Sequence, residues 1–218
     1  MPVQRLAIFD LDDTLIDRRS AVGSAVGSLC LARGYEPAVS QWLRTELADR
    51  ANPADFARLR TAFGLHESAE ELWHEYIHLM ATSTTCRPTV LEGLAHLRAA
   101  AWTIAIATNG PSDIQRAKLA ATGISKLVDG VAVSGDIDVR KPDRRLLELA
   151  AARSGMRLSD GGWITGDNPA SDIEGGRGAG LRTIWLRARP WPDSLAPPHH
   201  AVDDVTDAIT ILLNESPE

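Results

Sequence analysis

The segment FDLDDTL follows a short apolar run and places Asp10 and Asp12 two residues apart. Neighbouring carboxylates repel each other, so the pair has a use only where a cation or a proton lies between them. With magnesium present, one carboxylate can attack phosphorus as a nucleophile while the other transfers protons. A capped turn rich in aspartate, with no chemical role, explains the same segment.

A second acidic segment, ITGDNPASD, supplies Asp167 and Asp172 directly after another apolar run. Magnesium takes hard oxygen ligands, usually one or two carboxylates together with water and substrate phosphate. These two aspartates therefore suit a magnesium site. Asp172 also fits a structural interpretation, as an acid in the first turn of a helix, where the helix dipole favours negative charge.

Two further segments carry groups that bind phosphate. The segment ATNG ends an apolar run with Thr108, Asn109 and Gly110, whose hydroxyl, amide and backbone N–H groups can donate to phosphate oxygens. In VRKPD, Lys141 directly precedes a helical pattern, and its ammonium group can neutralise both Asp10 and a phosphoryl oxygen. A solvated surface lysine is the ordinary alternative.

The apolar runs before these residues are short and continuous, which is typical of strands buried on both faces. Helical patterns lie between the runs, and glycines stand at or just beyond the helix ends. This alternation predicts an α/β fold, a doubly wound parallel sheet with a Rossmann-like core. The expected strands lie near 6–11, 102–108, 128–134, 162–167 and 182–187. The expected helices lie at 113–122, 143–154, 169–176 and about 204–214, and the glycines expected at helix ends are Gly123, Gly155 and Gly180. Residues 188–202 are expected to form an ordered proline-rich loop.

The interval from about 16 to 87 interrupts the alternation with amphipathic helical stretches around 22–33, 40–49 and 67–81. It predicts a helical domain, residues 16–87, inserted after the first strand of a core formed by residues 1–15 and 88–218. In open α/β sheets the ligand crevice lies outside the carboxyl ends of the strands. Four strand ends in succession would therefore bring the acids, the phosphate donors and the lysine to one rim.

In order and spacing, these segments resemble the haloacid dehalogenase superfamily of hydrolases. DLDDT is similar to the first motif of that superfamily, the Thr of ATNG to the second, the Lys of RKPD to the third and GDNPASD to the fourth. The resemblance covers roughly residues 3–187, and the insert resembles the helical cap of type I members. It implies a phosphoric monoester hydrolase that depends on Mg²⁺ and acts on a small phosphorylated metabolite.

The resemblance also assigns roles to the acidic residues. Asp10 would become a phosphoaspartate, and Asp12 would protonate the leaving oxygen and then activate the hydrolytic water. Magnesium would be held by Asp10, the backbone carbonyl of Asp12 and Asp167, while Asp172 would bind the ion or order its waters.

The remaining motif residues are implied to bind the transferring group. Thr108 and the adjacent backbone of Asn109 and Gly110 would hold the phosphoryl group. Lys141 would stabilise negative charge on that group and on Asp10. The metal and this lysine would supply the local positive field that a phosphate ester needs in an acidic protein.

Asp12 separates branches of the family, because the dehalogenases cleave carbon–halogen bonds without a metal and lack an acid at that position. Asp13 stands where many relatives have Gly, a departure that leaves the interpretation unchanged. Two alternatives stay open. One is a sugar phosphomutase on the same fold, which the motifs do not separate from a phosphatase. The other is a catalytically silent binding module, against which the filled catalytic positions argue.

Composition limits the partners. A net charge of -6 and a pI near 5.5 indicate no basic surface for nucleic acid. No apolar run reaches the length of a membrane span, and the N-terminus lacks the pattern of a signal peptide, so we expect a cytoplasmic protein. Monomer and homodimer both remain possible.

Three other patterns compete with this interpretation. HEYIH at 74–78 matches a zinc-peptidase motif, but it lies inside the helical insert and lacks the extended spacing that some of these enzymes continue with. GGRGAG at 175–180 follows a helix and precedes a strand, the reverse of a dinucleotide loop, so helix termination explains it better. Arg18 and Arg19 follow the first motif and are candidates for a second anionic group of the substrate or for plain solvation.

Overall fold

The structure, a computed structural model, describes residues 4–215. The chain forms two compact units. The core unit comprises the residues up to Ile16, Cys86–Asn109 and the chain from Gly123 onward, and the helical unit comprises Asp17–Thr85 and Gly110–Thr122.

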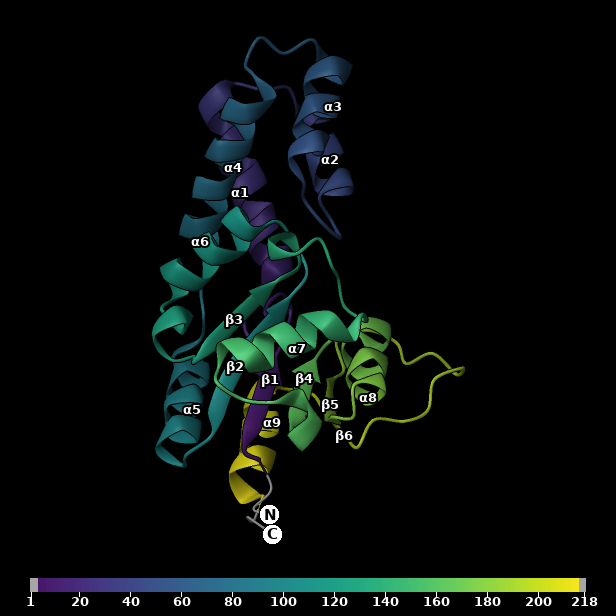
Figure 1. Cartoon of the computed structure of the whole chain (residues 1–218). Coiled ribbons are helices and arrows are strands. Elements are labelled where there is room, and N and C mark those ends of the chain that lie inside the picture. The colour runs from purple at the N-terminus through teal and green to yellow at the C-terminus, as the bar shows by residue number, and fades with distance from the viewer. Residues whose placement is uncertain (1–3, 216–218) are drawn as a thin grey trace. The chain divides into compact units, whose positions relative to one another are not determined.

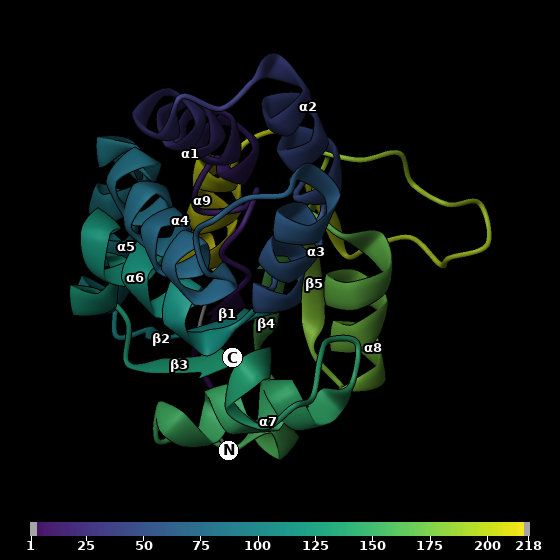
Figure 2. The same cartoon turned by 90° about the horizontal axis from the view of Figure 1, so that it is seen from above.

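The core unit is built on a sheet of six parallel strands in the order β3-β2-β1-β4-β5-β6. The strands are β1 (Leu6–Phe9), β2 (Thr103–Thr108), β3 (Gly130–Val133), β4 (Trp163–Gly166), β5 (Arg182–Leu186) and β6 (His200–Val202). Helix α7 (Arg144–Arg153) and the short helix α8 (Gly175–Gly178) cover one face, and α5 (Pro88–Ala99) and α9 (Val205–Asn214) cover the other (Figures 1 and 2). The predicted doubly wound parallel sheet is confirmed.

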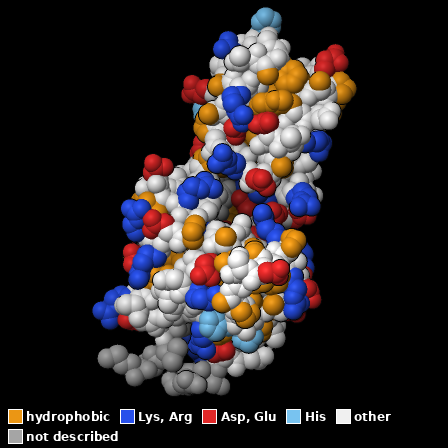
Figure 3. Space-filling view, turned by 90° about the vertical axis from the view of Figure 1, so that its right-hand side faces the viewer, with side chains coloured by type: hydrophobic (Ala, Val, Ile, Leu, Met, Phe, Trp, Pro, Cys, Tyr) orange, Lys and Arg blue, Asp and Glu red, His pale blue; other side chains and the backbone are white. Residues whose placement is uncertain are grey.

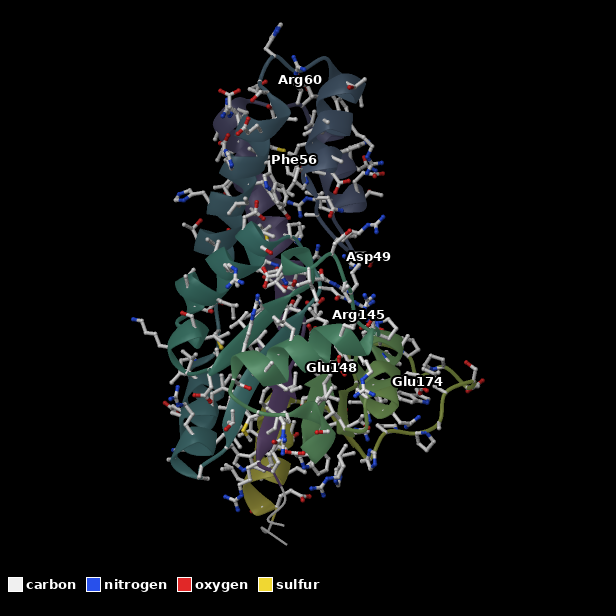
Figure 4. The ribbon with its side chains drawn as sticks, viewed as in Figure 1. Asp49, Phe56, Arg60, Arg145, Glu148 and Glu174 are labelled. Carbon is white, nitrogen blue, oxygen red and sulfur yellow. The ribbon has the colours of Figure 1, made fainter. Side chains whose placement is uncertain are left out.

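The strands form where the sequence predicts them, because their side chains are buried from both sides of the sheet. All four residues of β1 are buried, and Ile8 pairs with Ala105 of β2 and Ile164 of β4. On the outer face of α7, Arg145 and Glu148 point away from the sheet, whereas Leu146 and Leu147 are fully buried (Figure 4).

Strand β6 lies within the segment that the sequence analysis describes only as a proline-rich loop. It is short, and His200 and Ala201 provide no apolar run that would indicate a strand. Its pairing with β5, which sets Ile184 opposite His200, decides its conformation.

The glycines expected at helix ends have the backbone that this role requires. Gly123, Gly155 and Gly180 adopt φ values of 76°, 76° and 84°, a region that residues with a Cβ rarely occupy. In GGRGAG, helix termination is correct only for the last glycine. Gly175–Gly178 form α8 itself, where glycine is needed for close packing: a Cβ on Gly176 would lie 2.3 Å from Cγ2 of Ile164.

The helical unit buries its own apolar cluster. It consists of α1 (Arg18–Arg33), α2 (Pro37–Glu46), α3 (Pro53–Phe63), α4 (Ala69–Ser83) and α6 (Ser112–Thr122). Phe56, labelled in Figure 4, belongs to α3. It packs edge-on against Trp73 of α4, with ring centroids 5.6 Å apart. Asp17 caps α1, and a capping box of Ser68 and Glu71 begins α4, so both helices start where side chains satisfy their first N–H groups.

The helical unit differs in one segment from the predicted insert 16–87. Helix α6, which the sequence analysis places in the core, groups with the helical unit. Trp73 Nε1 donates to Asp113 Oδ2 at 2.8 Å, and Ile114 belongs to the apolar cluster of this unit. The strand–helix alternation identifies α6 as a helix but does not indicate which core it joins.

Arg18 has a structural contact within the helical unit. Its side chain is buried and donates to the carbonyls of Leu47, at 2.7 Å, and Ala48, which follow α2. These contacts tie the first residue of α1 to the segment that follows α2. None of the helices in residues 4–215 is long and apolar enough to cross a membrane.

Candidate active site

The first motif begins where β1 ends. Asp10 is 8% exposed, and its backbone N–H donates to the carbonyl of Thr165 at 2.9 Å, which continues the pairing of β1 with β4. The chain then turns sharply, with the N–H of Leu15 donating to the carbonyl of Leu11 at 3.0 Å. Asp13 takes a φ of 56°, a left-handed backbone conformation that Asp tolerates better than most residues.

Lys141 joins two of the predicted acids. Its Nζ lies 2.6 Å from Oδ1 of Asp10 and 2.7 Å from Oδ1 of Asp172, and all three side chains are buried. The solvated-lysine alternative is therefore wrong for this residue.

Asn109 holds the backbone that carries Lys141. Its Nδ2 donates to the carbonyl of Lys141 at 3.2 Å, and its Oδ1 accepts from the N–H of Lys141 at 2.9 Å. The Asn109 side chain, which the sequence predicts to bind phosphate, thus positions the backbone of Lys141. Thr108 is buried at the end of β2, two residues beyond Ile106, which pairs with Phe9, and so lies at the same end of the sheet as Asp10.

Asp172 is fully buried and hydrogen-bonded at both oxygens. Oδ2 accepts from the N–H of Asn168 at 3.0 Å, and Oδ1 contacts Lys141 and accepts from Ser171 Oγ at 3.3 Å. The carboxyl group lies against Gly166, where a Cβ would come within 2.4 Å of it. Glycine at the end of β4 therefore makes room for this aspartate.

Asp167 is held from two sides. Its backbone carbonyl accepts from Trp185 Nε1 at 3.1 Å, and its Oδ2 accepts from Arg189 Nε at 2.8 Å. Nothing in the spacing of Arg189 from Asp167 along the sequence predicts this contact, because the two residues follow different strands, β5 and β4.

One oxygen from each of Asp10, Asp167 and Asp172 lies within 4.8 Å of the others. Among the described residues this is the only group of three close carboxylate, imidazole or thiolate ligands. Buried carboxylate oxygens in this number suit a hard divalent cation, so the residues present fit magnesium.

The electrostatics of the group favour an additional cation. Burial raises the pKa of Asp10 above its ordinary value; Lys141 opposes this effect, and Asp172 adds to it. Burial alone would lower the pKa of Lys141, but its ion pairs raise it. Burial raises the pKa of Asp167 to about 6, against the lowering influence of Arg189. In the part of the chain that the structure describes, Lys141 and Arg189 pair with these three carboxylates, and a divalent cation would offset the remaining negative charge.

Asp167→Asn is expected to stabilise the metal-free protein at neutral pH. The folded-state pKa of about 6 lies above the ordinary value of 3.8, so stability from this group is present below the ordinary pKa and is lost as pH rises through 6. We expect a gain of up to about 3 kcal/mol at neutral pH and almost none near pH 3.5. Urea unfolding in EDTA at both pH values measures it, and equal destabilisation at both would contradict the prediction.

Other predicted residues take different positions. Asp12 follows Asp10 in the turn and pairs with Ile16 in an isolated parallel bridge. Gly110 falls in the helical unit, with a φ of 155° and a close approach to Gln115.

In HEYIH, His74 and His78 are exposed and Glu75 forms an ion pair with Arg33 at 2.5 Å, so the structure supports no zinc site there. The catalytic roles of the motif residues stay predictions.

Comparison with known proteins identifies the family. The model of the haloacid dehalogenase-like hydrolases matches residues 7–186, most of the chain. The chain belongs to this family. The match runs from residue 7, within β1, to the end of β5 and includes every motif residue named above, so the resemblance inferred from the motifs is confirmed.

Relatives within the family include enzymes of different reactions. The chain is 37% identical over 93 residues to a phosphoserine phosphatase of Thermus thermophilus, a match that covers 43% of this chain and only 37% of that protein. It is 28% identical to (S)-2-haloacid dehalogenase 1 of a Pseudomonas species, with 96% of both chains covered. Similarity therefore establishes a hydrolase of this family without choosing between a phosphate ester and a halogenated acid as the substrate.

The fold also matches solved structures. One is the magnesium-bound structure of the putative hydrolase YfnB of Bacillus subtilis, with a TM-score of 0.71, 22% identity and coverage of 96% of this chain and 98% of that one. At this identity the likeness shows the fold alone.

Proposed function

We propose that this hydrolase is a magnesium-dependent phosphatase that cleaves a small phosphomonoester through a phosphoaspartate on Asp10. The observation that carries the proposal is the buried cluster at the sheet edge, in which Lys141 contacts Asp10 and Asp172 beside Asp167. A nucleophile, a cation and oxygen ligands for a metal lie together there. Asp12 supports a phosphatase over a dehalogenase, because proton transfer to an alkoxide leaving group needs an acid.

In the first step, a carboxylate oxygen of Asp10 forms a bond to phosphorus as the bond from phosphorus to the ester oxygen breaks. Asp12 transfers its proton to the departing oxygen, which leaves as an alcohol. Lys141 stays on Oδ1 of Asp10 and stabilises negative charge during the transfer. Asn109 keeps the lysine in place through its two bonds to the backbone of Lys141.

In the second step, water attacks the phosphorus of the phosphoaspartate. Asp12, now a carboxylate, takes a proton from the water as the bond between phosphorus and Asp10 breaks, and inorganic phosphate is released. Bound magnesium would supply positive charge for the phosphoryl oxygens. Asp10, Asp167 and the backbone carbonyl of Asp12 would hold it, with Asp172 acting through its bond to Lys141 or through water.

The surface supports a small-molecule substrate. Figure 3 shows acidic and basic side chains intermixed over the face it displays, without a continuous basic area on that face. A nucleic acid requires a concentrated basic surface. We therefore propose a small phosphorylated metabolite as the partner.

The test is a panel of phosphorylated metabolites in which released phosphate is measured with magnesium and with EDTA. We expect turnover of at least one ester and a fall of at least tenfold in EDTA. A parallel assay with (S)-2-haloacids measures halide release. Halide without phosphate, at a rate that EDTA does not change, would replace the proposal with dehalogenation. Formation of an isomeric sugar phosphate with little free phosphate would replace it with a mutase.

A further inference from the structure

Arg189 contacts the site from a segment that the family motifs do not include. Residues 187–199 connect β5 to β6 and project from the edge of the sheet (Figures 1 and 2). From this loop the Nε of Arg189 donates to Oδ2 of Asp167 at 2.8 Å. The aspartate side chain is 5% exposed and the arginine side chain 45% exposed, so the pair joins a buried ligand to a group at the surface.

The loop that carries Arg189 is fixed by contacts of its own. Arg177 donates to the carbonyl of Ala196 at 2.9 Å, and Trp191 Nε1 donates to the carbonyl of Leu195 at 3.2 Å. The ring of Trp191 packs edge-on against Trp185 at 4.8 Å. Trp185 in turn donates to the backbone carbonyl of Asp167. The loop therefore contacts the side chain of Asp167 directly through Arg189 and its backbone indirectly through Trp191 and Trp185.

The two cations of the cluster differ in what their displacement would require. Lys141 is 4% exposed and lies between Asp10 and Asp172, so moving it would leave buried charges unpaired, which is unfavourable. Arg189 is nearly half exposed, and water can solvate its guanidinium group as it leaves the carboxylate. Of these two, Arg189 is the cation that an incoming ion can replace.

We propose that Arg189 is a resident counter-cation of the metal site, which neutralises Asp167 in the metal-free protein and is displaced when magnesium binds. The inference rests on the proposed magnesium site. A divalent ion takes hard carboxylate oxygens, and a guanidinium already bound to Asp167 competes for that carboxylate and repels the ion. Arg189 therefore lowers the affinity for magnesium and couples metal binding to the position of the loop 187–199.

The test is titration calorimetry of the full chain with magnesium chloride, with manganese as a second ion. Arg189→Gln is expected to bind magnesium at least about tenfold more tightly than the wild type, equivalent to about 1.4 kcal/mol. Arg189→Lys keeps a positive charge and is expected to stay within about threefold of the wild type. Arg187→Gln is the matched control, because Arg187 lies on the same loop but pairs with the exposed Asp203.

Tryptophan fluorescence provides a second measurement that does not depend on activity. Displacement of Arg189 should move the loop, so magnesium should change the wild-type emission, and Trp191→Phe or Arg189→Gln should reduce the change. If Arg189→Gln misfolds, the emission of the wild type and of Trp191→Phe, each with and without magnesium, still decides the question. An emission that magnesium leaves unchanged, although calorimetry shows the ion to bind, would overturn displacement.

Four calorimetric outcomes would also overturn the inference. Weaker binding by Arg189→Gln would make the arginine a supporting partner of Asp167, because outer partners of metal ligands usually raise affinity. If Arg187→Gln raised the affinity for magnesium as much as Arg189→Gln, the effect would come from removing any positive charge from the loop and not from the contact of Arg189 with Asp167. A wild type that binds neither ion would overturn the inference together with the proposed metal site, whereas binding with unchanged affinity in Arg189→Gln would overturn the inference alone.

Discussion

Asp10→Asn is expected to lower kcat by at least about a thousandfold, because an amide oxygen is a poor nucleophile toward phosphorus. The substitution keeps the shape of the side chain, and Asp172 still pairs with Lys141. We therefore expect a folded protein whose circular dichroism and cooperative melting match the wild type. The assay is phosphate release from the best ester of the metabolite panel with magnesium present.

Asp203→Asn provides the matched control for this variant. Asp203 is exposed and pairs with Arg187 far along the chain from the motifs, so its amide variant should keep full turnover. Full activity in Asp10→Asn would remove Asp10 as the nucleophile. Loss of activity in both variants would show that the assay reports something other than the chemistry of the site.

Lys141→Met is expected to destabilise the metal-free protein by about 3–5 kcal/mol, because removing one partner of a buried ion pair leaves uncompensated charge. Methionine approximates the length of lysine without its ammonium group, so Asp10 and Asp172 lose the cation that contacts both. Turnover should fall by at least about a hundredfold, the size of effect seen when a preorganised charge partner is lost. Urea unfolding in EDTA and the phosphate assay measure the two effects.

Magnesium should restore part of the stability of Lys141→Met, because an ion that binds only the folded protein stabilises it by mass action. Lys126→Met is the control, since Lys126 is exposed in the 3-10 helix Ile124–Lys126. A Lys141→Met protein as stable as the wild type in EDTA would contradict an ionised cluster around this lysine. Equal losses in the two methionine variants would point to a general effect of removing a lysine.

The strands and the order of the motif residues were predictable from the sequence, for a physical reason. Parallel strands are buried on both faces, so they appear as short continuous apolar runs, and their carboxyl ends meet at one edge. Asp10 and Lys141, 131 positions apart, could thus be expected at the same rim, where they form an ion pair. Residue types alone indicated a cation site there, because several carboxylates at one edge need a counter-charge.

Tertiary structure alone decided the contacts between loops and the grouping of helices. The bonds of Asn109 to Lys141 and of Arg189 to Asp167 depend on the paths of long connections, and no local periodicity records them. The same holds for α6, whose amphipathic pattern fits either core until Ile114 packs with the helical unit. Local patterns determine which elements form, whereas the contacts that tune a buried charge depend on how distant segments pack.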